Sequence, residues 1–321
     1  MSDPTECCYA PPGEYMKDHS FMYRDGWYHL YSISGTRGHS WQDTGNEETI
    51  AWSMSRDLVN WEFKGHVLHA SGWEGYFDQH EVWAPFVYRG PDAYYMFYTG
   101  ITLPGRSLKH NRGGATHPEP PHKHTETQGI ARSTDLSSWV KISDPVNGAQ
   151  IPGRDSHVVR DDDAGRFLLY STLGVLRAHA AESRDLVNWV PLGECAAFPE
   201  LTRQDFSPGR TCQGFPRFNG SESLTVMRHP VDGKWIMLGN WQYIRSDDPL
   251  RFPADAAELY DLEFEGEPVD IGFAGEMLER NGKWYRSGTI GKMHAWTLGF
   301  TEVAWVKGGA FRIVKPGRPR A

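Results

Sequence analysis

The sequence SRDLVNW at residues 55–61 recurs along the chain. It returns as STDLSSW at residues 133–139 and as SRDLVNW at residues 183–189, and a more divergent copy, SDDPLRF, covers residues 246–252. A phrase that repeats at intervals of roughly 50–80 residues indicates one supersecondary unit used several times. Such a unit cannot bury its own apolar face, so the copies must pack against one another.

Two strand-like runs joined by a tight turn form the core of each unit. In the first unit, Asp25-Gly26 separates residues 21–23 from residues 27–32, and Asp-Gly between aromatic runs is a strong hairpin signal. Comparable turns follow in the other four units, at residues 90–92, 161–165, 231–233 and 281–282. Five units of four antiparallel strands predict an all-β fold, a five-bladed β-propeller that forms a single domain over residues 1–321.

Three details of this propeller follow from the sequence. The Ser and Asp of the repeated phrase are expected to cap the turn between the third and fourth strands, and its Trp to pack between blades. The segment before Asp18 is expected to complete the last blade, because closure by strands from both ends protects the sheet edges. An insertion at about residues 103–127 is expected to rim the functional site, and it contains His110, His117, His122 and His124.

Composition excludes several classes of protein. The chain has 13 Trp, 14 Tyr and 15 Phe, which suit packing between sheets and also a cleft that binds sugars. A net charge of −8 without a long run of Lys and Arg argues against nucleic acid as a partner. No apolar stretch reaches ~18 residues, so no membrane partner is expected. The start of the chain lacks the regions of a signal peptide, and the four Cys lack metal-binding spacing, which predicts a cytoplasmic protein with reduced thiols.

An acidic residue opens the first strand of every unit. These residues are Asp18, Glu81, Asp155, Glu222 and Glu276. The first strand of each blade lines the axis of a propeller, so the five carboxylates are expected to converge on one cavity. Like charges at close range force some of them to pair with Arg or His or to carry raised pKa values. Hydrolysis of a glycosidic bond needs this combination, because one carboxyl donates a proton and another acts as base or nucleophile.

The chain resembles the five-bladed glycosidases of glycoside hydrolase families 43 and 32. The resemblance rests on the phrases above and on Asp18, Trp83-Ala84-Pro85, Arg154-Asp155 and Glu222-Ser223. It implies that Asp18 is the base or nucleophile, that Asp155 stabilises the transition state and that Glu222 is the general acid. It further implies hydrolysis of a furanoside or xylose-like bond in a short oligosaccharide, of the arabinofuranosidase, xylosidase or fructofuranosidase type, with no required cofactor.

The resemblance also suggests further site residues. Those expected to contact the substrate are His19, His80, Glu81, Trp83, Arg154, His157, Arg228, Trp241 and Glu276. Members of family 43 often hold a structural calcium ion on the propeller axis through a histidine, and His294 is the candidate for that ligand here. The sequence does not specify an oligomeric state.

The chain departs from both families near the acids. Family 32 usually has Asn before the first aspartate, where this chain has Lys17, and family 43 often has Pro after it, where this chain has His19. Glu81, Glu276 and His80 are rival acids, and Glu194 of Glu194-Cys195 is a weaker rival because it falls on an outer strand. Chain length and Trp83-Ala84-Pro85 favour inversion of configuration, as in family 43, whereas Arg154-Asp155 favours retention, as in family 32. On balance the sequence predicts inversion.

Two other functions are compatible with the sequence. A propeller can bind sugars without hydrolysing them, although acids at every blade entry argue against this. A phosphorolytic glycosidase would need a basic cluster that binds phosphate near the acid. Arg228 and His229, close to Glu222 in the sequence, could form that cluster.

Overall fold

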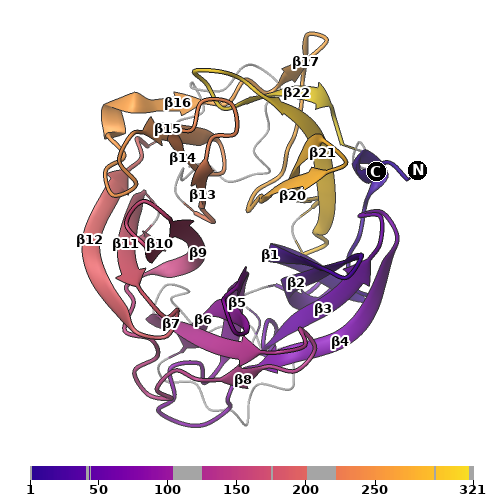
Figure 1. The fold of residues 1–321 in the computed structure, drawn as a ribbon. Helices are drawn as coiled ribbons and strands as arrows, with labels where there is room; N and C mark the ends of the chain where they lie inside the picture. The colour runs from indigo at the N-terminus through magenta and orange to yellow at the C-terminus, as the bar shows by residue number, and fades with distance from the viewer. Residues whose placement is uncertain are drawn as a thin grey trace.

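The computed structural model shows five β-sheets arranged around a central axis (Figure 1). The structure describes residues 2–40, 43, 45–103, 125–174, 176–200, 222–292 and 294–317. Each sheet has four strands that follow one another in chain order from the axis outward. The predicted five-bladed β-propeller is therefore confirmed.

Every blade is an antiparallel meander. Blade one consists of β1 (Glu14–Arg24), β2 (Trp27–Thr36), β3 (Thr49–Ser55) and β4 (Trp61–His69). Blade two consists of β5 (Glu81–Arg89), β6 (Tyr94–Thr102), β7 (Thr125–Ser133) and β8 (Val140–Lys141). Blade three consists of β9 (Arg154–Asp161), β10 (Arg166–Leu173), β11 (Arg177–Ser183) and β12 (Trp189–Ala197). Blade four consists of β13 (Thr225–Arg228), β14 (Trp235–Leu238), β15 (Gln242–Ser246) and β16 (Ala257–Leu259). Blade five consists of β19 (Met277–Arg280), β20 (Lys283–Ile290), β21 (Thr297–Trp305) and β22 (Phe311–Lys315).

A few short elements lie outside the blades. A two-stranded hairpin, β17 (Glu263–Phe264) and β18 (Glu267–Pro268), lies between blades four and five in the sequence. Two 3-10 helices complete the described elements, η1 (Pro4–Glu6) and η4 (Ala254–Ala256). Within the described ranges, no helix has the length and apolar character needed to cross a membrane.

The repeated phrase forms the turn between the third and fourth strands, as predicted. In the first copy the Ser55 hydroxyl accepts hydrogen bonds from the backbone N–H groups of Asp57 and Leu58, and the Asp57 carboxylate accepts those of Val59 and Asn60. Leu58 has a φ of 64° and is fully buried. The second and third copies repeat this pattern of bonds and the positive φ of the leucine.

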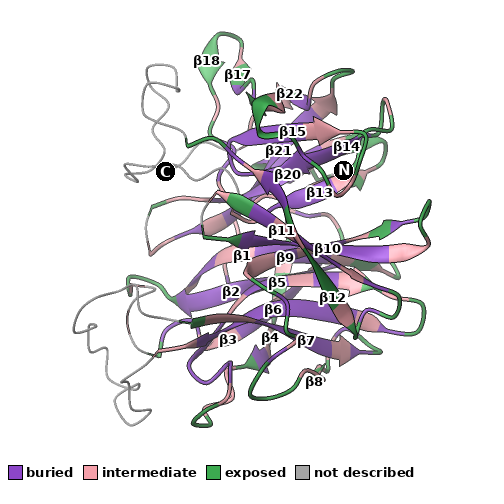
Figure 2. Cartoon of the chain, turned by 90° about the vertical axis from the view of Figure 1, so that its left-hand side faces the viewer, coloured by how far each residue is buried: buried purple, intermediate pink, exposed green. Residues whose placement is uncertain are grey.

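The aromatic residue that ends the phrase packs on the preceding blade. Trp139 of blade two meets Tyr31 of blade one edge to face, with ring centroids 5.6 Å apart. Trp189 of blade three meets Phe97 of blade two in the same way at 5.5 Å. Edge-to-face pairs of buried rings stabilise an interface beyond their burial alone. The phrase therefore fixes both a turn and the contact between blades, and the buried strands of neighbouring blades form the core (Figure 2).

The N-terminal segment closes the ring. The backbone of Tyr9 exchanges two hydrogen bonds with Leu298 of β21, with N···O distances of 3.2 and 2.7 Å. Further along, β22 pairs with β21 over residues 302–305. Segments from both ends of the chain thus cover the outer edge of β21, which confirms the predicted closure.

The predicted insertion is shorter at its far end than the sequence indicated. Residues 103–127 were expected to form a loop, but residues 125–127 belong to β7. The four histidines of the insertion lie outside the described residues, so their expected position at the rim stays a prediction.

Candidate active site

Among the described residues, one non-glycine residue with positive φ stands in, or just before, the first strand of each blade. The five are Asp18 (39°), Ala84 (44°), Asp155 (55°), Ser223 (51°) and Ala274 (50°). In blades one, two and three the pairing with the second strand shifts its register at this point, as expected for a β-bulge. All five residues line one cavity on the axis. Non-glycine residues in this conformation store backbone strain, which is typical of functional sites.

The sequence suggested that the five acids occupy equivalent positions in the five blades, and the positive-φ residues show that they do not. In blades two, four and five the counterpart of Asp18 and Asp155 is an alanine or a serine, not an acid. Glu222 directly precedes its bulge residue, whereas Glu81 precedes its own by three positions and Glu276 follows its own by two. The five acids are therefore not at equivalent positions, although Asp18, Asp155 and Glu276 all line the axial cavity.

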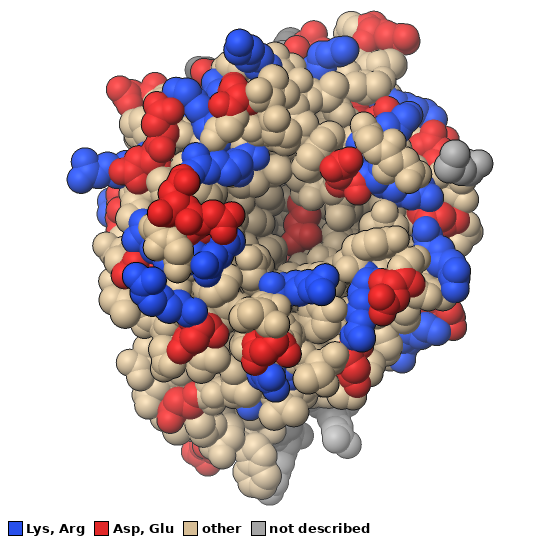
Figure 3. Space-filling view, viewed as in Figure 1, with Lys and Arg blue, Asp and Glu red and all other residues tan. Residues whose placement is uncertain are grey.

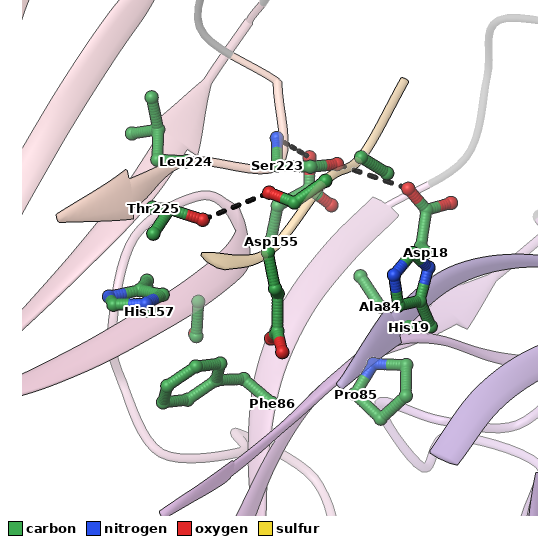
Figure 4. Close-up of a pocket in the computed structure, with 14 residues that line it drawn as sticks. Asp18, His19, Ala84, Pro85, Phe86, Asp155, His157, Ser223, Leu224 and Thr225 are labelled. Carbon is green, nitrogen blue, oxygen red and sulfur yellow. Dashed lines mark hydrogen bonds between the residues drawn. The ribbon is translucent and has the colours of Figure 1, made fainter. Parts of the chain in front are cut away.

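Ser223 links the two equivalent aspartates across the axis (Figure 4). Its hydroxyl donates a hydrogen bond to Asp18 Oδ1 at 3.0 Å, and its backbone N–H donates to Asp155 Oδ2 at 3.2 Å. The cavity between them is about 30 Å³, enough for one or two water molecules. A space-filling view shows the axis hollowed, with acidic atoms visible inside the opening (Figure 3).

Arg154 connects the remaining acid to this pair. Its Nη2 lies 2.5 Å from Glu222 Oε1, and its Nε lies 3.4 Å from Asp155 Oδ2. Its Nη1 lies 3.3 Å from Glu126 Oε2 of β7 and donates to the backbone carbonyl of Gly174. The Arg154 side chain is only 14% exposed, so these ion pairs are weakly screened by water.

The electrostatics favour protonation of Asp155 and Glu222. The pKa of Asp155 is raised to about 7, chiefly by burial and also by the charges of Asp18 and Glu222, against the lowering effect of Arg154. Burial also raises the pKa of Glu222, again opposed by Arg154. A cluster in which ionised and protonated carboxyls coexist near neutral pH can both donate a proton and supply an attacking or activating carboxylate.

A cationic group lies beside Asp18. The Lys17 ammonium is 3.1 Å from Glu47 Oε2 and stands 5.2 Å from the ring centre of Trp83 and 5.9 Å from that of Trp296. Burial lowers the pKa of Lys17, but Glu47 and Asp18 together hold it above its usual value. The fixed charge and the two indole rings make a polar and aromatic wall next to Asp18.

A family comparison agrees with this geometry. The model of the glycosyl hydrolases family 32 N-terminal domain matches residues 9–197, which include both equivalent aspartates and Arg154. The chain belongs to glycosyl hydrolase family 32. It is a glycosidase by that membership. No curated protein matches its sequence.

Solved structures share the fold of this family 32 chain. The RS223 β-xylosidase is 16% identical, covers 97% of this chain and 98% of its own, and superposes with a TM-score of 0.62. A GH43_1 enzyme from Xanthomonas citri, complexed with xylotriose, is 16% identical over 97% of this chain and 94% of its own, with a TM-score of 0.63. The GH32 β-fructofuranosidase BmSUC1 of Bombyx mori is 17% identical over 98% of this chain and 66% of its own, with a TM-score of 0.59.

Three more of the expected residues line the cavity of the family 32 chain. His19 is buried and its Nε2 lies 2.8 Å from the Ser287 hydroxyl, while His157 Nδ1 accepts from the backbone N–H of Val226. Burial lowers the pKa of each histidine to about 3, so both are neutral near pH 7. Glu276 Oε2 accepts a hydrogen bond from the backbone N–H of Phe21 at 3.1 Å, and burial raises its pKa to about 8.

Replacing Glu276 with glutamine is expected to make stability less dependent on pH. The folded pKa of Glu276 lies above the unfolded value of about 4.3, so the folded chain binds the extra proton between these pH values. The stability of the wild type therefore falls as pH rises from about 4 to about 8. Glu276→Gln should come closest to the wild type at about pH 4 and be more stable at about pH 9, by up to a few kcal/mol.

Thermal unfolding at both pH values measures this effect. Glu279→Gln, an exposed substitution on the same strand, is the matched control and should leave the pH dependence unchanged. Equal pH dependence in Glu276→Gln and the wild type would show that Glu276 titrates normally.

The structure does not bring Arg228 or Trp241 to the mouth of the cavity. Arg228 is at the far end of β13, where it pairs with Asp163 at 2.5 Å in the turn between β9 and β10. Its neighbour His229 is buried and faces Asp232. Trp241 is 9% exposed and belongs to a hydrophobic cluster between blades four and five. Arg228 and His229 therefore do not form the basic cluster that a phosphorolytic glycosidase would need beside Glu222.

His80 and Glu81 are buried at the beginning of β5 and do not line the axial cavity. His80 Nδ1 accepts a hydrogen bond from the backbone N–H of Leu103. Trp83 comes closer to the mouth through its contact with Lys17. Glu194 is on β12, an outer strand, where it pairs with Arg177, as the sequence indicated.

His294 is the histidine that the sequence suggested for a calcium ion on the axis. This residue lies in the turn before β21, packs against Trp296 and does not line the axial cavity. In the part of the chain that the structure describes, no group of three or more His, Cys, Asp or Glu is arranged to hold a metal ion. A structural calcium ion and activity without an added cofactor both stay predictions.

Three groups of this site, Glu126, Lys17 and Glu47, were not predicted from the sequence. Glu126 was assigned to the insertion, Lys17 was noted only as a departure from the family pattern, and Glu47 was not considered. Each acts through a partner on another strand or blade, and no local sequence signal marks such pairs.

Proposed function

We propose that the protein hydrolyses a furanoside or xylose-like glycosidic bond in a short oligosaccharide. Glu222 is the general acid, Asp18 is the carboxylate that attacks the anomeric carbon, and Asp155 stabilises the positive charge that develops on the sugar. Membership of family 32 and the fold shared with fructofuranosidases and xylosidases support this substrate range. The xylotriose bound by the Xanthomonas citri enzyme supports a short oligosaccharide as substrate.

One observation supports the proposal above all others. Three carboxyl groups from three blades are tied together at the mouth of the axial cavity, two through Ser223 and two through Arg154. Their environments differ, because Arg154 lies against Glu222 and Asp155 whereas Asp18 faces a serine hydroxyl and Lys17. Unequal environments around a group of carboxyls are the condition for a separate acid and nucleophile.

The reaction then takes two displacements. In the first, Glu222 gives its proton to the glycosidic oxygen, the bond from that oxygen to the anomeric carbon breaks, and an Asp18 oxygen bonds to the carbon. In the second, water attacks the same carbon, Glu222 takes the proton of the water, and Asp18 leaves as a carboxylate. The positive charge that develops on the sugar favours the ionised form of Asp155, whose pKa is about 7 in the free site, and this carboxylate stabilises that charge in both transition states.

The product anomer tests the stereochemistry. Inversion, with Asp18 as a base, was the prediction from the sequence. The resemblance to family 32 implied retention instead, and the match to that family now favours it. We expect proton NMR of the first product to show the anomer of the substrate. The other anomer would restore the single-displacement mechanism, with Asp18 activating a water molecule.

A panel of aryl glycosides tests the function itself. Arabinofuranoside, xyloside, fructoside and galactoside should be assayed with and without phosphate, and hydrolysis of at least one without phosphate is expected. Turnover only with phosphate would show a phosphorylase. Binding without turnover would show a sugar-binding propeller.

A further inference from the structure

One guanidinium serves three carboxylates at the mouth. Arg154 Nη2 faces Glu222, Nε faces Asp155, and Nη1 faces both oxygens of Glu126 at 3.3 and 3.4 Å. Glu126 is 23% exposed and Glu222 is 38% exposed. Arg154 carries one positive charge and faces three acids. How strongly it stabilises the ionised form of each acid therefore depends on the other two.

The contact with Arg154 opposes the role of Glu222 as a general acid. A carboxyl that donates a proton must be protonated when the reaction begins, and an adjacent guanidinium favours its ionised form. A second carboxylate on the same guanidinium offsets this effect, because it draws the cation towards itself and adds a negative charge nearby. Glu126 is placed to do both from β7.

We propose that Glu126 is a positioning residue that holds the Nη1 side of Arg154 and thereby keeps Glu222 able to carry the proton of the reaction. This inference rests on the general-acid role of Glu222 proposed above. Glu126 contacts the guanidinium and not the reacting atoms, so its effect passes through Arg154. The resemblance to known families did not indicate a residue at this position.

Other charged groups around Glu222 also shift its pKa. Asp18 raises the pKa of Glu222, and Lys17 of the same strand lowers it. The charge of Glu126 also raises the pKa of Asp155. All of these groups remain in place when Glu126 alone is changed, so a difference between the variant and the wild type reports Glu126.

Glu126→Gln removes the charge and keeps an oxygen that can accept from Arg154. We expect the alkaline limb of the pH profile of kcat/KM to move to lower pH by about one unit, the size expected for one charge at this range. Activity at the shifted optimum should remain, since no reacting group is lost.

Glu182→Gln is the matched control. Arg166 also binds two acids, Glu182 at 2.6 Å and Asp161 at 3.0 Å, but at the other end of blade three. If loss of an Arg–carboxylate contact affects only stability, Glu126→Gln and Glu182→Gln should behave alike. Neither variant should then shift a limb of the pH profile of kcat/KM. An unmoved limb in Glu126→Gln would overturn the proposal.

A direct titration separates this inference from the proposed function. Carbon-13 NMR of protein labelled at the glutamate carboxyl carbon, with Glu222→Gln used for assignment, reads the pKa of Glu222 without substrate. A lower pKa in Glu126→Gln supports the inference even if no glycoside is hydrolysed. An unchanged pKa in a protein that does hydrolyse glycosides refutes the inference and leaves the proposed function standing.

Discussion

Replacing Asp18 with asparagine should lower kcat/KM by about 10⁴-fold or more, since the reaction loses the group that bonds to the anomeric carbon. Asparagine has nearly the same shape and tolerates the positive φ of 39° at this position, so the fold should remain. It can also still accept the hydrogen bond from Ser223. Steady-state kinetics on the best aryl glycoside, together with a thermal unfolding curve, measure both effects.

Asp25→Asn is the matched control for this variant. Asp25 lies in the turn after β1, also has a positive φ, and its side chain is 83% exposed. Its activity should equal that of the wild type. Calorimetry should show that Asp18→Asn still binds the oligosaccharide that it does not hydrolyse. If Asp18→Asn kept a tenth of the activity or more, Asp18 would not be the attacking group.

The fold was predictable because its determinants are local. The repeated phrase contains all of the groups that form its turn, the Ser and Asp acceptors and the leucine with positive φ, within seven residues. The Asp25-Gly26 turn likewise sits within one hairpin. A pattern that carries its own hydrogen bonds can be read without knowing the rest of the chain, and its repetition then gives the number of blades.

The site was predictable only in part. Asp18 and Asp155 were found because both lie near the beginning of a first strand, which the hairpin pattern locates. The bulge was not visible, because a positive φ in a strand leaves no signature when the residue is aspartate or alanine. Without the bulge position, the acids of the other blades were aligned with the wrong residues.

The partners of the acids could not be derived from the sequence. Glu126 and Arg154 come from different blades. Lys17 of β1 pairs with Glu47, which lies in the long connection between β2 and β3. The first pair depends on how neighbouring blades are positioned and the second on the path of a connection, and the strand pattern of a blade contains neither. Arg228 shows the converse error, since it is near Glu222 in sequence but points into the turn at the far end of its strand.

Replacing Glu222 with glutamine should affect substrates according to their leaving groups. A glycoside with an alkyl or sugar leaving group needs protonation, so kcat/KM should fall by about 10²–10⁴-fold. A nitrophenyl glycoside leaves without that proton, so the first displacement should slow far less. The ratio of kcat/KM for the two substrates measures the contribution of the acid directly.

Glu194→Gln provides the control for this last variant, because Glu194 was the rival acid in the sequence and lies on β12 beside Arg177. It should leave the ratio between the two substrates unchanged. Equal losses for both leaving groups in Glu222→Gln would assign Glu222 to binding or to the support of Arg154. Glu276, which lines the axial cavity, would then be the next acid to test.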